Sequence, residues 1–161
     1  MIMTVQQFHE VQDLILRFWA CVDEIAEIEG AALFTAKGAL VIETFRAEGQ
    51  EALTRYFTAR RTLSVERQRS TRHLCTNLRQ LPRAGVREGG VRMVATITVF
   101  SGTGPRPIAL GAPSSLADFT FDCVETGQGW KFTCVSGALI FAGADTPDLQ
   151  KAAAAAQGES T

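Results

Sequence analysis

The first thirty residues carry apolar side chains at intervals of three and four positions, which predicts an amphipathic helix. Thr4 is a suitable N-cap for this helix and Gly30 a suitable end. Beside the apolar stripe, Trp19 precedes Asp23 by one turn, so we expect this carboxylate at the margin of the buried side. The stripe consists of Phe8, Val11, Ile15, Phe18, Val22 and Ile25.

Over residues 31–66 the spacing of apolar residues changes several times. It predicts a short helical turn over residues 31–35, and a strand over 39–45, which is rich in β-branched and aromatic residues. Helical spacing of apolar residues returns over 49–66 and predicts a second helix.

From residue 72 onward, polar and apolar positions alternate, as they do in β-strands. Segments that are typical of hairpin connections separate these alternating runs. Helices followed by strands joined through hairpins predict an α+β fold, with the N-terminal helices packed on a curved antiparallel sheet. The four predicted strands cover 72–82, 91–101, 115–126 and 129–141. We expect one domain over 1–145, and over 146–161 an alanine-rich tail that is flexible or helical.

Alternation also predicts which side chains share a face. His73, Cys75 and Asn77 lie on one face of the strand 72–82, and its pattern fits either face as the buried one. If their face is the inner one, His73 and Asn77 enter a pocket walled by aromatics and cysteines, typical of a small-molecule site. The predicted substrate-binding residues are Trp19, Cys75, Asn77, Phe119, Phe121, Trp130 and Cys134.

Composition narrows the function classes. The chain has 161 residues, 46% of them apolar, and a net charge of −1, so neither disorder nor nucleic-acid binding is expected. The opening MIMTVQQFHE has no signal-peptide character and no run is long enough to span a bilayer, so we expect a soluble cytoplasmic protein. The cysteines form no CxxC pair, so no metal site is expected, and small buried hydrophobes are the favoured interpretation.

Two further features leave alternatives open. A basic run could bind an anionic ligand, but its charge pattern favours a solvated helix face. The loop 101–115 could be a lid or an oligomer contact. His9 lies among polar neighbours and is expected at the surface. The basic run consists of Arg60, Arg61, Arg67, Arg69 and Arg72.

The order of these motifs resembles a known family. A helix with an aspartate near its end, a strand and second helix, R-H-L-x-x-N at 72–77 and G-x-G-W-K-F at 127–132 resemble the SnoaL-like branch of the nuclear transport factor 2-like superfamily. The resemblance runs from about residue 5 to 142. It implies a cone-shaped α+β barrel around a deep pocket, commonly assembled as a homodimer or homotrimer.

Within that superfamily the chain is most similar to the scytalone dehydratase and hexachlorocyclohexane dehydrochlorinase group. Those enzymes use a histidine–aspartate dyad, and the matching positions here are His73 and Asp23. The resemblance favours an inward-facing His73. Accessory residues differ: Ser101 or a neighbour stands at the position of a second histidine, Val22 at that of a tyrosine, and Val135 at that of an arginine. Neither specific reaction is therefore implied.

The first hypothesis is a cofactor-free enzyme of the lyase or isomerase type. His73 would abstract a proton from a hydrophobic substrate and Asp23 would orient it. The alternative is a non-catalytic ligand-binding or assembly subunit, like the small subunit of ring-hydroxylating dioxygenases. A cyclase or ketosteroid-isomerase activity based on Asp118 or Asp122 ranks lower, because alternation points both carboxylates outward.

Overall fold

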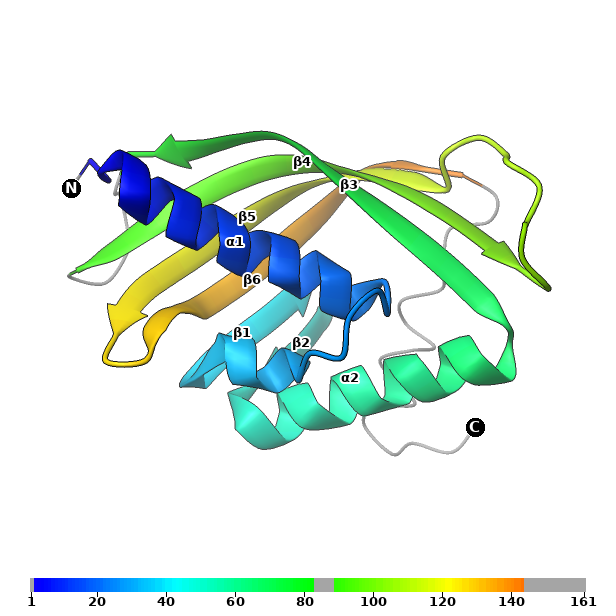
Figure 1. The fold of residues 1–161 in the computed structure, drawn as a ribbon, viewed down its shortest axis with the longest axis horizontal. Helices are drawn as coiled ribbons and strands as arrows, with labels where there is room; N and C mark the ends of the chain where they lie inside the picture. Colours follow the sequence, from blue (N-terminus) through cyan, green and yellow to red (C-terminus); the bar gives the residue numbers. More distant parts are fainter. Residues whose placement is uncertain (1, 83–88, 144–161) are drawn as a thin grey trace.

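The computed structural model describes residues 2–82 and 89–143 (Figure 1). The predicted tail over 146–161 lies outside the described residues. The elements, in chain order, are α1 (Val5–Val22), the 3₁₀ turn η1 (Gly30–Leu33), β1 (Phe34–Ile42), β2 (Phe45–Glu48), α2 (Gly49–Glu66), β3 (Arg69–Leu81), β4 (Gly90–Thr103), β5 (Ser115–Thr126) and β6 (Gly129–Ala142).

A six-stranded curved sheet runs in the order β2-β1-β6-β5-β4-β3, and α1 lies across one of its faces (Figure 1). The helix α2 follows β2 in the chain and packs against β1, β2 and β3. The predicted α+β class with helices on a curved sheet is confirmed. The sheet is mixed rather than wholly antiparallel, because β1 pairs in parallel with β6.

The N-terminal helix begins as predicted and ends early. Thr4 caps it in a capping box with Gln7, which satisfies two backbone N–H groups of the first turn. The helix ends at Val22 instead of continuing to Gly30, since Glu24 takes a positive φ of 55° that no right-handed helix accommodates. The predicted strand 39–45 is likewise interrupted by a turn at Glu43, whose φ is 52°, and becomes β1 and β2.

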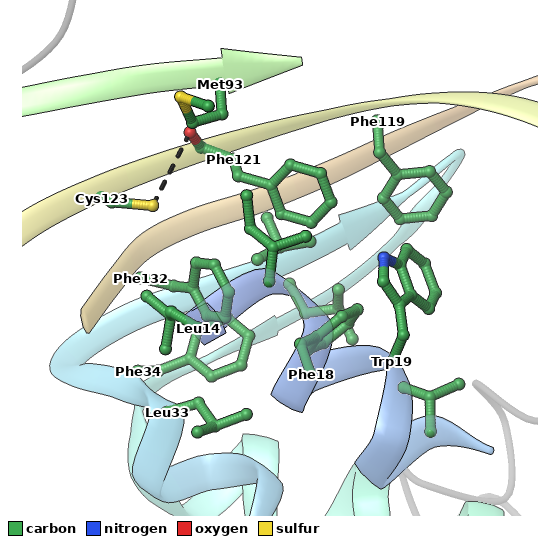
Figure 2. Packing of buried hydrophobic residues seen from close by; sticks show 14 of the residues in the cluster. Leu14, Phe18, Trp19, Leu33, Phe34, Met93, Phe119, Phe121, Cys123 and Phe132 are labelled. Atoms are coloured by element: carbon green, nitrogen blue, oxygen red, sulfur yellow. Dashed lines mark hydrogen bonds between the residues drawn. The ribbon is translucent and has the colours of Figure 1, made fainter. Parts of the chain in front are cut away.

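The core lies between α1 and the sheet (Figure 2). Phe18 is 2% exposed and stands at its centre, with four phenylalanine rings edge-on to its own at centroid distances of 5.7–6.5 Å. Edge-to-face aromatic pairs of this kind add to the stabilisation from burial alone. This packing fixes α1 on the sheet and therefore fixes the position of its C-terminal end. The four rings are those of Phe34, Phe57, Phe121 and Phe132.

Two β-bulges change which side chains point inward. The β3–β4 register shifts between Thr76 and Arg79, where Asn77 has a φ of 56° and is exposed. The β5–β6 register shifts beside Cys134, so that Val135 becomes the fully buried residue and Cys134 turns to the outer side. An extra residue in one strand reverses the alternation beyond it. The predicted inward positions of Asn77 and Cys134 are therefore wrong.

Candidate functional site

The carboxylate of Asp23 joins the end of α1 to β3. Asp23 is the C-cap residue of α1, and its side chain is 3% exposed. Oδ1 accepts hydrogen bonds from Thr71 Oγ1 at 2.8 Å and from His73 Nδ1 at 2.6 Å, while Oδ2 accepts the backbone N–H of His73 at 2.7 Å. Three donors thus hold a buried carboxylate in one orientation.

The alternation of side chains along β3 places two of these three donors, the Thr71 hydroxyl and the His73 ring, on the same face. Thr71 and His73 are two residues apart on β3, so both side chains point to the face that α1 covers. The His73 side chain is 12% exposed, whereas the neighbouring Leu74 is 46% exposed. The orientation of His73 that the sequence pattern left open is therefore inward.

Trp19 holds the imidazole from a second direction. Its indole ring stacks on His73 with ring centroids 4.6 Å apart and the planes inclined by 15°. The Trp19 N–H is buried, has no nitrogen or oxygen partner among the described residues, and interacts with the sulfur of Cys75. Stacking fixes the plane of the imidazole, and Nδ1 is bonded to Asp23. Nε2 is therefore the ring nitrogen that is available to exchange a proton with a bound molecule.

A cavity of about 80 Å³ lies in front of His73. Trp19 and Phe119 line it, as predicted from the sequence. The other lining residues come from both helices and from five strands: Phe18, Val22, Ile42, Tyr56, Arg60, Arg69, Val99, Ser115, Ala117, Gly137 and Leu139. The walls are mostly apolar, with the polar groups concentrated on α2 and β3, an arrangement suited to orienting an organic molecule.

Several predicted pocket residues lie elsewhere. Phe121 is fully buried in the core behind Phe119, and Cys75 contacts Trp19 without lining the cavity (Figure 2 shows the two phenylalanines). Trp130 lies far from His73, and its indole N–H donates to Glu10 Oε2 at 3.1 Å. Trp130 lies beside the first half of α1, whereas the cavity lies beside the last turn of this helix.

Arg60 and Arg69 line the cavity, although the charge pattern favoured a solvated face for the whole basic run. That interpretation is wrong for these two residues. Arg61 is exposed on α2 as expected, while Arg67 and Arg72 are exposed but lie after the helix and on β3. Two signals pointed to this result. Arg69 shares the alternation of His73 on β3, and Arg60 lies one helical turn after the buried Tyr56.

The two members of the pair have pKa values that suit a neutral histidine beside an ionised aspartate. Burial lowers the pKa of His73 below its ordinary value, and the charges of Arg60 and Arg69 act in the same direction against the opposing effect of Asp23. Burial alone would raise the pKa of Asp23, but the hydrogen bonds from His73 and Thr71 outweigh it and the pKa is lowered.

Because the pKa of Asp23 is lowered, we expect its contribution to the free energy of unfolding to depend on pH. A carboxyl group with a depressed pKa in the folded state stabilises the protein above its unfolded-state pKa, and this contribution disappears as the pH falls through the folded-state value. At pH 7, Asp23→Asn should lower the free energy of unfolding by about 1–3 kcal/mol. Urea unfolding between pH 7 and pH 2 should show this difference shrinking below about pH 4. A difference that stays constant over that range would contradict the assignment.

Two other kinds of site are not found in the described part of the chain. Within residues 2–82 and 89–143, no three His, Cys, Asp or Glu side chains gather as they would around a metal ion. Neither α1 nor α2 has the length and apolar character that a membrane-spanning helix needs.

Comparison with known proteins identifies the family of this α+β domain. The model of the SnoaL-like domain matches residues 3–135, so the chain belongs to the SnoaL-like family. No curated protein sequence matches it.

Solved structures share the fold at low sequence identity. A protein of unknown function with a cystatin-like fold from Nostoc punctiforme is 19% identical, with a TM-score of 0.68 over 91% of this chain and 98% of that one. A scytalone dehydratase-like protein from Novosphingobium aromaticivorans is 15% identical, with a TM-score of 0.67 over 85% and 86%. The LinA-type3 hexachlorocyclohexane dehydrochlorinase from Novosphingobium barchaimii is 18% identical, with a TM-score of 0.64 over 86% and 90%.

Proposed function

We propose that this protein is a cofactor-free enzyme in which neutral His73 removes a proton from carbon on a hydrophobic substrate, in a lyase or isomerase type of reaction. The observation that carries the proposal is the 2.6 Å contact between Asp23 Oδ1 and His73 Nδ1, at the wall of a mostly apolar cavity. The enzyme-type names of two structural neighbours of the same fold, a dehydratase and a dehydrochlorinase, agree with it.

The geometry assigns a role to each atom of the pair. With Asp23 ionised, the proton of the neutral imidazole resides on Nδ1 and is donated to Oδ1, which leaves the lone pair of Nε2 directed away from Asp23. Nε2 takes the substrate proton, and the carbon's electron pair moves into an adjacent carbonyl or expels a leaving group. The buried carboxylate stabilises the imidazolium that forms.

Activity should follow the protonation state of His73. The base is competent only when neutral, and its pKa lies below the ordinary 6.5. The rate constant kcat/KM should therefore rise with pH through one apparent pKa below that value and stay level up to pH 8. An activity that falls over this range would mean that a protonated group does the work.

A substrate screen can detect the proton transfer before the natural substrate is known. Cyclic ketones, β-hydroxy ketones, chlorinated cyclohexanes and small carboxylic acids that carry a ketone or hydroxyl group would be incubated in D₂O with the wild-type protein and with His73→Gln. Proton NMR would follow deuterium incorporation and elimination. We expect at least one compound to react with the wild type alone. Equal reaction with the variant would reject His73 as the base.

The second candidate, a non-catalytic ligand-binding or assembly subunit, is supported by the size of the cavity. Its volume of about 80 Å³ is well below the usual range of small-molecule sites. A protein that binds a large partner chain and turns over no compound would fit this role. Co-purification of such a partner, together with an unreactive wild type in the screen, would favour it over the first candidate.

A further inference from the structure

Two guanidinium groups from different elements meet at the cavity that His73 faces. Arg60 comes from α2 and Arg69 from the first residue of β3, and both line it. Arg60 Nε donates to the backbone oxygen of Val22 at 3.3 Å, and its Nη2 lies 3.5 Å from Thr71 Oγ1. The backbone of Arg69 pairs with Thr103 of β4, and its guanidinium group makes no hydrogen bond or ion pair with any residue in 2–82 or 89–143.

The cavity has an excess of positive charge. No lining residue is an aspartate or glutamate, and the adjacent carboxylate of Asp23 is already bound by His73 and Thr71. Burial and the neighbouring charge of Arg60 together lower the pKa of Arg69 to about 10, which still leaves it protonated at neutral pH. Two half-buried cations that line a cavity without a carboxylate are energetically unfavourable unless an anion accompanies them.

The spacing along β3 relates this charge to the base. Arg69, Thr71 and His73 follow one another on the same face, and side chains two residues apart in a strand are about 6–7 Å apart. Arg60 lies opposite the middle position, because it contacts Thr71. An anion held between the two guanidinium groups therefore has its attached carbon atoms directed toward the apolar walls and His73.

We propose that Arg60 and Arg69 bind the carboxylate of a small hydrophobic carboxylic acid, whose carbon skeleton occupies the apolar part of the cavity beside His73. The planar guanidinium group matches a carboxylate through two parallel hydrogen bonds. Ile42, Val99, Ala117 and Leu139 supply the apolar walls, and the cavity of about 80 Å³ favours a compact skeleton. This inference rests on the proposed function and narrows its substrate to an organic acid.

Matched pairs of probes test the inference on the wild-type protein alone. Benzoate is compared with benzamide, and isobutyrate with isobutyramide, because each pair has one shape and differs in charge. Binding is measured at pH 7 by isothermal titration calorimetry, and the indole N–H cross-peak of Trp19 reports contact with the cavity. At least one carboxylate should bind about tenfold or more tightly than its amide, since charge-assisted hydrogen bonds are about twice as strong as neutral ones. Amides that bind as tightly as the acids, or no binding of either acid up to 10 mM, would overturn it.

Variants then test which residues produce the preference for the carboxylate over its amide. Arg60→Met and Arg69→Met should each remove most of the preference for the carboxylate, whereas Arg61→Met, an exposed arginine on the same helix, should keep it. Circular dichroism verifies the fold of each variant, and if a methionine variant fails to fold, glutamine, which is also uncharged, replaces methionine at that position. Equal losses in Arg61→Met and Arg69→Met would reduce the effect to net charge and reject the site.

One more variant separates this inference from the proposed function. His73→Gln should keep the wild-type preference for the carboxylate over its matched amide, because this preference comes from Arg60 and Arg69, whereas the affinity of both probes for the cavity that His73 lines is free to change. Intact carboxylate binding with no turnover of any compound by the wild type would reject the catalytic proposal and leave the anion site standing. Turnover of neutral substrates without carboxylate binding would do the reverse.

Discussion

Replacing His73 by glutamine is expected to lower kcat on an identified substrate by about 10²–10⁴-fold, the usual contribution of a general base. Glutamine keeps a donor for Asp23 and much of the volume under Trp19, so the cavity should persist. It has no lone pair basic enough to accept a proton from carbon. Steady-state kinetics should therefore show a large fall in kcat with little change in KM.

Two companion variants sharpen this result. Asp23→Asn removes the charge that stabilises the imidazolium and should lower kcat less than the loss of the base itself does. Glu27→Gln, which removes an exposed carboxylate four residues further on, should leave kcat within about twofold of the wild type, as expected for a surface substitution. A His73→Gln variant with wild-type turnover would place the chemistry elsewhere.

Replacing Phe18 by alanine is expected to lower the free energy of unfolding by about 3–5 kcal/mol. Phe18 is 2% exposed and contacts four other phenylalanine rings, which cannot all move inward to fill the space. The loss is a large part of the total stability of a typical domain, about 5–15 kcal/mol. Urea unfolding should show a lower midpoint at an unchanged m-value.

The matched control lies two residues earlier on the same helix. Leu16 is 49% exposed, and Leu16→Ala should change the free energy of unfolding by no more than about 0.5 kcal/mol. A loss below 1 kcal/mol in Phe18→Ala would mean that the aromatic cluster does not hold α1 on the sheet. The position of Asp23 would then need another explanation.

The local elements could be predicted because their signals lie within a few residues. The start of α1 at Thr4, the span of α2 and the hairpin strands all follow from apolar spacing and capping residues. The parallel pairing of β1 with β6 could not, because it joins segments that are about a hundred residues apart and no turn specifies it. Periodicity describes one element at a time and carries no information about such neighbours.

The pair at the site was predicted from a family resemblance, and several surrounding residues were misplaced for an identifiable reason. Asn77 lies within a bulge and Cys134 directly follows one, and nothing in the local sequence marks the extra residue. Arg60 and Arg69 were assigned to a solvated face because they sit within a basic run. The strand alternation shared with His73 marked Arg69, and the helical spacing from Tyr56 marked Arg60, but only the packing of α2 against β3 shows that both line one cavity.

The third hydrogen bond of Asp23 has a consequence beyond chemistry. The strand β3 ends the sheet order and pairs on one side with β4, so the backbone N–H of His73 points outward and donates to Asp23 Oδ2 at 2.7 Å. Unpaired N–H groups along an edge strand offer a template for another chain. The carboxylate therefore occupies one of the donors that a second chain would need for strand addition. Preparations of Asp23 variants should be tested by light scattering before their kinetics are interpreted.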